Sequence, residues 1–157
     1  MSSIERLDEA TLPAPQISKS NYLQTVVVNG LVYLSGQLPY VNGKLASTGS
    51  VGELVSVEQG IEAARRCGLN ALAALRAEIG TLERVIRVIR LTGYVSAAEG
   101  FTDHSRVIDG ASATLIDYLG DCGRHARSAI GVRNLPRGAP VEIELTVAIA
   151  AREQSIQ

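Results

Sequence analysis

An Asn-Gly pair between two runs of aliphatic and β-branched residues restricts the fold of this chain more than any other feature of its sequence. The pair is Asn29-Gly30, and the runs cover residues 24–28 and 31–35. A two-residue hairpin turn needs positive φ at both central positions, which asparagine and glycine tolerate best. We therefore predict two antiparallel strands here, and a further turn at residues 42–43 that can add a short strand at residues 44–46.

Two segments have the spacing of amphipathic helices. In the first, Ser56 and Gln59 are placed as in a capping box, and apolar residues then recur every three or four positions as far as Ile79. The second segment begins near residue 102 or 103 and ends before Gly120. Its expected buried side consists of Ile108, Ala111, Ser112, Leu115 and Leu119.

Three further segments are typical of strands. Residues 84–91 have an arginine at every third position, as a helix face would, but the residues between them are mostly β-branched, which favours a buried strand. Residues 128–132 are followed by residues 141–149, where apolar and polar residues alternate. Because two helices can cover only one face of five or six strands, we predict an α/β (α+β) domain with a mixed sheet. The other face is open to water or to another subunit.

Alternation in the strand around residue 127 indicates a candidate binding site. We expect Arg127, Ala129 and Gly131 to share the sheet face that lacks helices, with Glu142 or Glu144 facing Arg127 from the neighbouring strand. A guanidinium beside small residues leaves space for a ligand, and its planar fork of donors suits a carboxylate. An arginine so close to a glutamate lowers the pKa of the glutamate and keeps it ionised.

Length and composition exclude several classes of protein. The 157 residues fit one domain, residues 1–157, in which residues 1–15 form an N-terminal arm. A net charge of −1, a pI near 6.1 and the absence of tryptophan disfavour a nucleic-acid surface. No apolar stretch is long enough for a membrane span and no secretory signal is visible, so we expect a cytoplasmic protein with reduced cysteines. The two cysteines and two histidines lack the spacing of metal ligands, and no cofactor is indicated.

Four sequence motifs together resemble those of a known family. They are His-Ala-Arg-Ser-Ala-Ile-Gly-Val at 125–132, Asn-Leu-Pro at 134–136, Val-Glu-Ile-Glu at 141–144 and Val-Tyr-Leu-Ser-Gly-Gln-Leu-Pro at 32–39. With them the chain resembles the RidA family, also called YjgF, over residues 15–152. The resemblance implies a chorismate-mutase-like fold and a homotrimer with three clefts between subunits. It also implies a cofactor-independent hydrolysis of reactive enamines and imines, such as 2-aminoacrylate, to 2-oxo acids and ammonia.

The resemblance assigns roles to individual residues. Arg127 matches the arginine that binds the carboxylate of the substrate, and Glu142 matches the glutamate that orients the attacking water. Residues that match the lining of the cleft are Tyr22, Ser35 and Gly36. On this interpretation Arg127 and Glu142 are the catalytic pair.

Two positions depart from the pattern of the family. Ala129, which would adjoin the substrate, stands where many deaminating members have cysteine, and the asparagine of the family is replaced by Asp109 or Gly110. These departures leave open whether the chain is an enzyme. The alternative is a non-catalytic binder or sensor of small carboxylates such as 2-oxo acids. Arg127 could also form only a structural ion pair with Glu142 or Glu144, and none of the motifs identifies the substrate.

Overall fold

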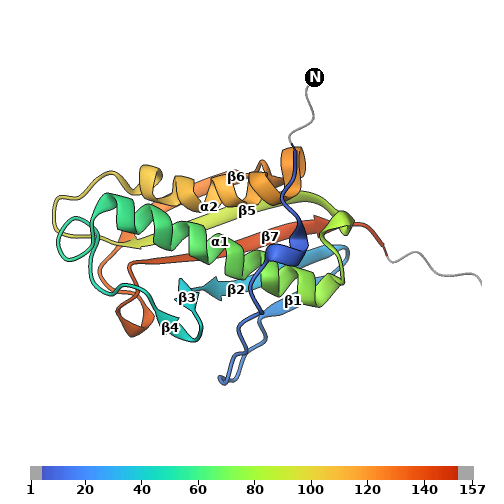
Figure 1. Ribbon diagram of the computed structural model, residues 1–157, viewed down its shortest axis with the longest axis horizontal. Helices are drawn as coiled ribbons and strands as arrows, with labels where there is room; N and C mark the ends of the chain where they lie inside the picture. Colours follow the sequence, from blue (N-terminus) through green and yellow to red (C-terminus); the bar gives the residue numbers. More distant parts are fainter. Residues whose placement is uncertain (1–4, 152–157) are drawn as a thin grey trace, which may run out of the picture.

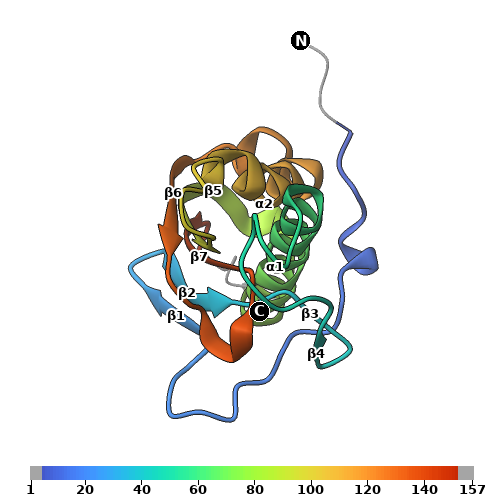
Figure 2. The same cartoon turned by 90° about the vertical axis from the view of Figure 1, so that its left-hand side faces the viewer.

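A five-stranded sheet carries both helices on one face in the computed structural model, which describes residues 5–151 (Figures 1 and 2). The strands are β1 (Thr25–Val28), β2 (Leu31–Gln37), β5 (Val85–Ser96), β6 (Ala126–Val132) and β7 (Val141–Ile149), and the helices are α1 (Val57–Ile79) and α2 (His104–Leu119). The strand order is β1-β2-β7-β5-β6, and β5 and β6 are parallel whereas the other neighbours are antiparallel. The predicted mixed sheet with two helices on one face is confirmed.

The predicted hairpin at Asn29-Gly30 is confirmed. Val28 at the end of β1 pairs with Leu31 at the start of β2, and both turn residues have positive φ. The second turn, at residues 42–43, joins β3 (Tyr40–Val41) to β4 (Lys44–Leu45). These two short strands form a separate ribbon, so the extra strand does not extend the main sheet.

Both helices begin and end where the sequence indicates. The Oγ of Ser56 accepts a hydrogen bond from the backbone N–H of Gln59, and Oε1 of Gln59 accepts one from the backbone N–H of Ser56. These two bonds complete the predicted capping box. Helix α2 ends at Gly120. The core between helices and sheet is formed by residues at most 7% exposed, among them Leu72, Leu75, Leu115, Ile143 and Leu145. Neither helix, nor any other within residues 5–151, is long and apolar enough to cross a bilayer.

The geometry of strand β5 explains why an arginine recurs at every third position of residues 84–91. Val85, Val88 and Leu91 are buried, and the residues between them are exposed. The pairing with β7 slips between Val85 and Arg87 and again between Val88 and Arg90. Each slip adds one extra residue to β5, which keeps every third side chain on the core face. The predicted strand is therefore confirmed, with its arginines at exposed positions.

The sheet face opposite the helices is uncovered in a single copy of the chain. Along β7, residues that alternate with the buried ones, including Glu142 and Glu144, point to this open face. Exposed apolar side chains flank the polar middle, at Val26 and Val28 on the edge strand β1 and at Ile130 on the edge strand β6.

The chain before β1 lies against the helices. The backbone N–H of Leu7 donates to the carbonyl of Asp117 at 2.8 Å, and a carboxylate oxygen of Glu9 accepts the N–H of Leu82 at 2.7 Å. Glu9 also forms an ion pair with Arg76, with 3.5 Å between Oε1 and Nε. Figure 2 shows this segment on the outer side of the helix layer. Of the predicted arm, residues 1–15, residues 5–12 are thus held by α1 and α2, and residues 1–4 lie outside the described residues.

Candidate functional site

A cavity of about 630 Å³ lies at the end of the sheet where β2 leaves it and β7 begins. Its walls come from residues 16–22, from the end of β2, from the short turn Pro136–Gly138 and from the start of β7. Figure 1 shows the β3–β4 ribbon and the β6–β7 connection at this same end of the sheet. Three of the predicted site residues line the cavity, namely Tyr22, Gly36 and Glu142.

Gly36 and Glu142 are in close contact inside this cavity. The pairing of β2 with β7 slips between Leu34 and Gln37, so Gly36 lies in an irregular part of β2. A Cβ atom at position 36 would overlap the carboxylate of Glu142. Glycine therefore provides the space that this carboxylate occupies, which is a physical reason for the Ser-Gly-Gln sequence at the end of β2.

The environment of Glu142 favours its protonated form. Burial raises the pKa of Glu142 above its ordinary value of 4.5, and the negative charge of Glu144 raises it further. The expectation that an arginine beside Glu142 lowers this pKa is wrong, because Arg127 is not its neighbour. A carboxyl group with a raised pKa exchanges its proton closer to neutral pH, and this is the property required of a general acid–base group.

The raised pKa of Glu142 predicts a specific pH dependence of stability. The folded protein binds the proton of Glu142 more tightly than the unfolded chain, so this residue destabilises the fold above its folded pKa. That penalty decreases as the pH falls through the folded pKa towards 4.5. We expect Glu142→Gln to raise Tm at pH 8, with the difference from wild type closing by pH 4.5. Thermal unfolding across this pH range measures it, and a difference that grows on acidification would contradict the assignment.

Gly36→Ala tests the position of the Glu142 carboxylate. The clash falls on the end of a flexible side chain, so we expect the fold to survive while the carboxylate moves. Displacing a reacting group by about 1 Å costs on the order of 10²-fold in rate. We therefore expect a loss of that size in any reaction that uses Glu142, measured as kcat/KM. The same substitution in Glu142→Gln should cause no further loss, and additive losses would show that Gly36 acts through another group.

The prediction that Arg127 faces the uncovered side of the sheet is wrong. In the parallel β5–β6 pair, Arg127 lies opposite the buried Leu91, so it points to the helix side of the sheet. Ala129 points the same way, whereas Ile130 faces the open side and is 45% exposed. The sequence pattern misleads here because the apolar residues of this edge strand point outwards. Its small residues lie beneath α2, where a Cβ on Gly131 would overlap the ring of His104.

Arg127 is held by four hydrogen bonds to α2. Its Nη1 donates to Oδ1 of Asp109 at 2.8 Å and to Oγ of Ser112 at 3.1 Å. Its Nη2 donates to Oγ of Ser105 at 2.6 Å and to the carbonyl of Ser105 at 3.3 Å. Glu142 lies on the other face, and β5 separates its strand from β6. The predicted contact between Arg127 and Glu142 or Glu144 on a neighbouring strand is therefore wrong within one copy of the chain.

Ser112 connects Arg127 to His125. The Oγ of Ser112 lies 3.0 Å from Nε2 of His125 and accepts from Arg127. Ser112, predicted on the buried side of the helix, is only partly buried. Burial lowers the pKa of His125, and the positive charge of Arg127 acts in the same direction. The polar side chains along this edge of α2 are thus engaged with one another.

Ser35 supports the cavity without lining it. Its Oγ donates to the carbonyl of Leu23 at 2.6 Å, next to Tyr22 in the chain. Gln37, which is buried, donates from Nε2 to Oε1 of Gln24 at 2.7 Å. Both bonds fix the segment that carries Tyr22 onto β2.

Two positively charged side chains that line the cavity are not among the residues predicted from the sequence. Lys19 lies on the wall formed by residues 16–22, and Arg137 lies in the turn Pro136–Gly138. Arg137 has φ of 58°, in the left-handed region that residues with a side chain seldom adopt. The only signal in the sequence is an arginine between Leu-Pro and glycine, which is ordinary for an exposed turn.

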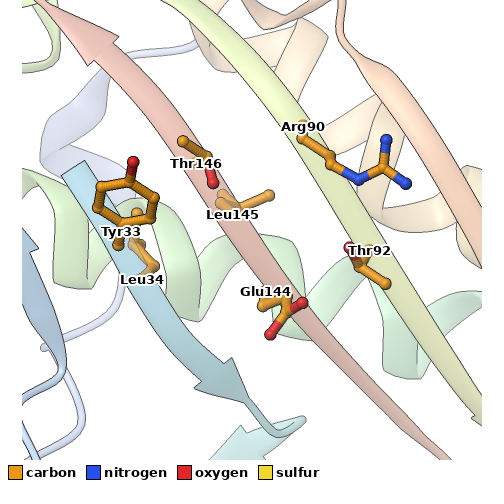
Figure 3. Close-up of a pocket in the computed structure, with 7 residues that line it drawn as sticks. All are labelled: Tyr33, Leu34, Arg90, Thr92, Glu144, Leu145 and Thr146. Atoms are coloured by element: carbon orange, nitrogen blue, oxygen red, sulfur yellow. The ribbon is translucent and has the colours of Figure 1, made fainter. Parts of the chain in front are cut away.

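A smaller hollow of about 290 Å³ lies on the open face of the sheet. Figure 3 shows its lining residues, contributed by β2, β5 and β7: Tyr33, Leu34, Arg90, Thr92, Glu144, Leu145 and Thr146. Two of its charged groups are engaged nearby, because Arg90 donates to Ser128 and Glu144 accepts from Tyr94. None of the predicted site residues lines this hollow, so the larger cavity is the better candidate site.

Metal-binding groups and disulfides are absent from the part of the chain that the structure describes. No three His, Cys, Asp or Glu side chains within residues 5–151 are placed to hold a metal ion. Cys67 and Cys122 are both free, as predicted. Burial raises the pKa of Cys67, which makes its thiolate hard to form.

The chain matches known proteins over most of its length. The family described as "YjgF/chorismate mutase-like, putative endoribonuclease" matches residues 5–141. The chain belongs to this family. The predicted membership of the YjgF/RidA family and the chorismate-mutase-like fold are thereby confirmed.

Individual proteins are similar to the chain over most of its length. Protein TCP17 of Trypanosoma cruzi is 39% identical, over 87% of this chain and 86% of its own length. The crystal structure of a protein of unknown function from Agrobacterium tumefaciens is 42% identical with a TM-score of 0.85, over 89% of this chain and 86% of the other. A structure described as a putative endoribonuclease from Shewanella oneidensis is 31% identical, also with a TM-score of 0.85, over 88% and 91% of the two chains.

The departures from the YjgF/RidA pattern lie away from the Glu142 cavity in a single copy. Asp109 is the ionic partner of Arg127. Gly110 faces α1, where a Cβ atom would overlap the carbonyl of Ile61. Ala129 lies beside Arg127 on the helix side of β6. The asparagine of the family is therefore replaced, at one of the two candidate positions, by the residue that holds Arg127.

Proposed function

We propose that this chain hydrolyses small reactive imines and enamines to 2-oxo acids and ammonia in the Glu142 cavity. The observation that carries the proposal is Glu142, a half-buried carboxyl group with a raised pKa that is held over Gly36 at the wall of a cavity of about 630 Å³. Membership of the YjgF/RidA family, shown over residues 5–141, supports it, and the resemblance in sequence adds Glu142 through the Val-Glu-Ile-Glu motif.

The proposed reaction needs one proton-transferring group and no cofactor. Glu142 accepts a proton from water as the water oxygen bonds to the electrophilic imine carbon. The proton is then delivered to the nitrogen, which gives a carbinolamine. Glu142 next takes the proton of the carbinolamine hydroxyl and passes it to the amino group, so the C=O bond of the 2-oxo acid forms as the C–N bond breaks and ammonia leaves. An enamine is first protonated on its β-carbon to give the imine. General acid–base catalysis of this kind typically contributes ~10²–10⁴-fold.

The proposed role of Arg127 in binding the substrate carboxylate requires two copies of the chain. Arg127 and Glu142 point to opposite faces of one sheet, so they can contact one ligand only if Arg127 of one copy approaches Glu142 of another. A homotrimer with clefts between subunits, as the family resemblance implies, supplies such an arrangement. The carboxylate of the substrate would then replace Asp109 as the partner of Nη1.

The proposal is tested by generating imines with an amino-acid oxidase and following their decay together with formation of the 2-oxo acid. We expect acceleration in proportion to protein concentration, and its loss in Glu142→Gln. No acceleration across a panel of side chains would reject the proposal. Light scattering on the same sample reports the assembly, and a monomer with full activity would reject the role of Arg127 across copies.

A non-catalytic binder of small carboxylates is the second candidate. Ala129 in place of the cysteine of the family favours it. This candidate predicts that 2-oxo acids bind in calorimetry whereas no imine is turned over.

A further inference from the structure

We propose that Asn70 is a positioning residue of the Glu142 cavity, because its side-chain amide holds residues 38–40 in place as one wall of the site. This inference deepens the proposed function and rests on it, since it concerns how the same cavity binds its ligand. Asn70 lies in the core and does not itself line the cavity. It acts through the wall that it holds.

Asn70 is a polar side chain in apolar surroundings. It lies in the middle of α1, is fully buried, and has the buried apolar residues Leu69, Ala71 and Leu72 as neighbours in the chain. Its Oδ1 is buried and has no hydrogen-bond partner among residues 5–151. Burial of an unpaired polar atom is unfavourable. A leucine at this position would avoid that cost, so stability alone does not explain the asparagine.

The amide nitrogen of Asn70 makes two hydrogen bonds, and both hold the same short segment. Nδ2 donates to the carbonyl of Leu38 at 2.9 Å and to the carbonyl of Tyr40 at 3.1 Å. These residues flank Pro39, where the chain passes from the end of β2 to the start of β3. The N–H of Tyr40 also donates to the carbonyl of Leu38 at 2.9 Å, which makes the segment a tight turn. Asn70 therefore attaches this turn to α1 (Figure 1).

The side chains of this turn belong to the cavity. Leu38 and Tyr40 both line it, together with Gly36 and Glu142. The carboxyl group of Glu142 is placed by β7 and by its close contact with Gly36. Loss of the two bonds from Asn70 is therefore expected to displace a wall that contacts the ligand, while the reacting carboxyl group stays in place. Such a change weakens ground state and transition state binding alike, which raises KM and leaves kcat nearly unchanged.

The experiment replaces Asn70 by leucine, which fills a similar volume but has no donor. We expect KM for imines formed by an amino-acid oxidase to rise by roughly 10-fold, because small displacements in a binding site have large effects. We expect kcat to change by less than about twofold. Asn70→Ala removes the same donors without adding apolar volume and should give the same rise in KM. All assays are run well below the Tm of each variant, where a merely structural role would leave KM unchanged.

Thr114→Val is the matched control. Thr114 is also a buried polar residue of a helix, but its Oγ1 donates to the carbonyl of Gly110 within α2 and not to the cavity wall. We expect wild-type KM and kcat in this variant, whatever its Tm. A folded Asn70→Leu with lowered Tm and wild-type KM would overturn the inference, as would an equal rise of KM in Thr114→Val. Failure of both Asn70 variants to fold would also overturn it, since Asn70 would then serve the whole fold and not the site.

A wild type that hydrolyses none of the imines would reject the proposed function, and the inference is then judged on the wall itself. Amide hydrogen exchange at residues 40–45, which follow Pro39, serves this purpose. Faster exchange of these residues in Asn70→Leu than in wild type and Thr114→Val, with exchange in β5 unchanged, would support it. Unchanged exchange at Tyr40 would overturn it.

Discussion

Replacement of Glu142 by glutamine is expected to lower the rate of imine hydrolysis by ~10²–10⁴-fold, the usual contribution of a general acid–base group. Glutamine fills the same space over Gly36 and is equally polar, but it cannot carry the proton between water and the imine nitrogen. Because the loss is in proton transfer and not in binding, we expect kcat to fall while KM changes little. The measurement is steady-state hydrolysis of an imine formed in situ by an amino-acid oxidase.

Glu144→Gln provides the matched control for this result. Glu144 lies two residues further along β7 on the same open face, where its carboxylate accepts from the hydroxyl of Tyr94 at 2.9 Å. It lines the smaller hollow and not the Glu142 cavity. We expect only a small loss in this variant, because burial is the larger cause of the raised pKa of Glu142 and the charge of Glu144 is the smaller one. A loss as large as that of Glu142→Gln would mean that the negative charge of the open face, and not a proton transfer by Glu142, supports the reaction.

The largest expected loss of stability follows from Gly110→Ala. Gly110 lies on the side of α2 that packs against α1, and an added Cβ would overlap the backbone carbonyl of Ile61. A backbone carbonyl cannot relieve the overlap by a change of rotamer as a side chain can, so α1 and α2 must move apart. Alanine is the better helix former by up to about 1 kcal/mol, and the clash must exceed this gain. We expect a net decrease in the free energy of unfolding of about 3 kcal/mol, measured by urea denaturation.

Gly68→Ala serves as the control, because the same substitution in α1 causes a milder overlap with α2. Its Cβ would lie 3.1 Å from Cβ of Thr114, a side-chain atom that can shift by a few tenths of an ångström. We expect a loss clearly smaller than that of Gly110→Ala. Equal effects of the two substitutions, or an increase in stability in Gly110→Ala, would show that α1 and α2 are further apart than the structure has them.

Elements whose signals are local could be predicted from the sequence. The Asn29-Gly30 hairpin, the Ser56–Gln59 capping box and the alternation along β7 depend on neighbours in the chain, and each is confirmed. The family resemblance also indicates three residues of the cavity, because Gly36 and Glu142 lie within its motifs and Tyr22 matches a residue of the cleft. Local pattern and motif spacing therefore account for most of the fold and half of the predicted site.

Features that depend on distant contacts could not be predicted. The sequence predicts the wrong orientation for β6 because Ile130 and Val132 are apolar and alternation alone does not show which face of the sheet carries the helices. Nothing in the chain near residue 127 indicates that β5 lies between β6 and β7. The position of Arg137 depends on a left-handed turn that brings it opposite a segment more than a hundred residues earlier in the chain.

The position of β7 in the sheet has a consequence for synthesis of the protein. Strand β7, the last of the described strands in chain order, lies between β2 and β5 and pairs with both. Until it emerges, the hairpin β1–β2 and the parallel pair β5–β6 have no strand to join them, and their apolar faces stay in contact with solvent and chaperones. The complete sheet therefore forms only after β7 has been synthesised, and a premature stop codon before residue 141 leaves the β1–β2 hairpin and the β5–β6 pair without the strand that joins them.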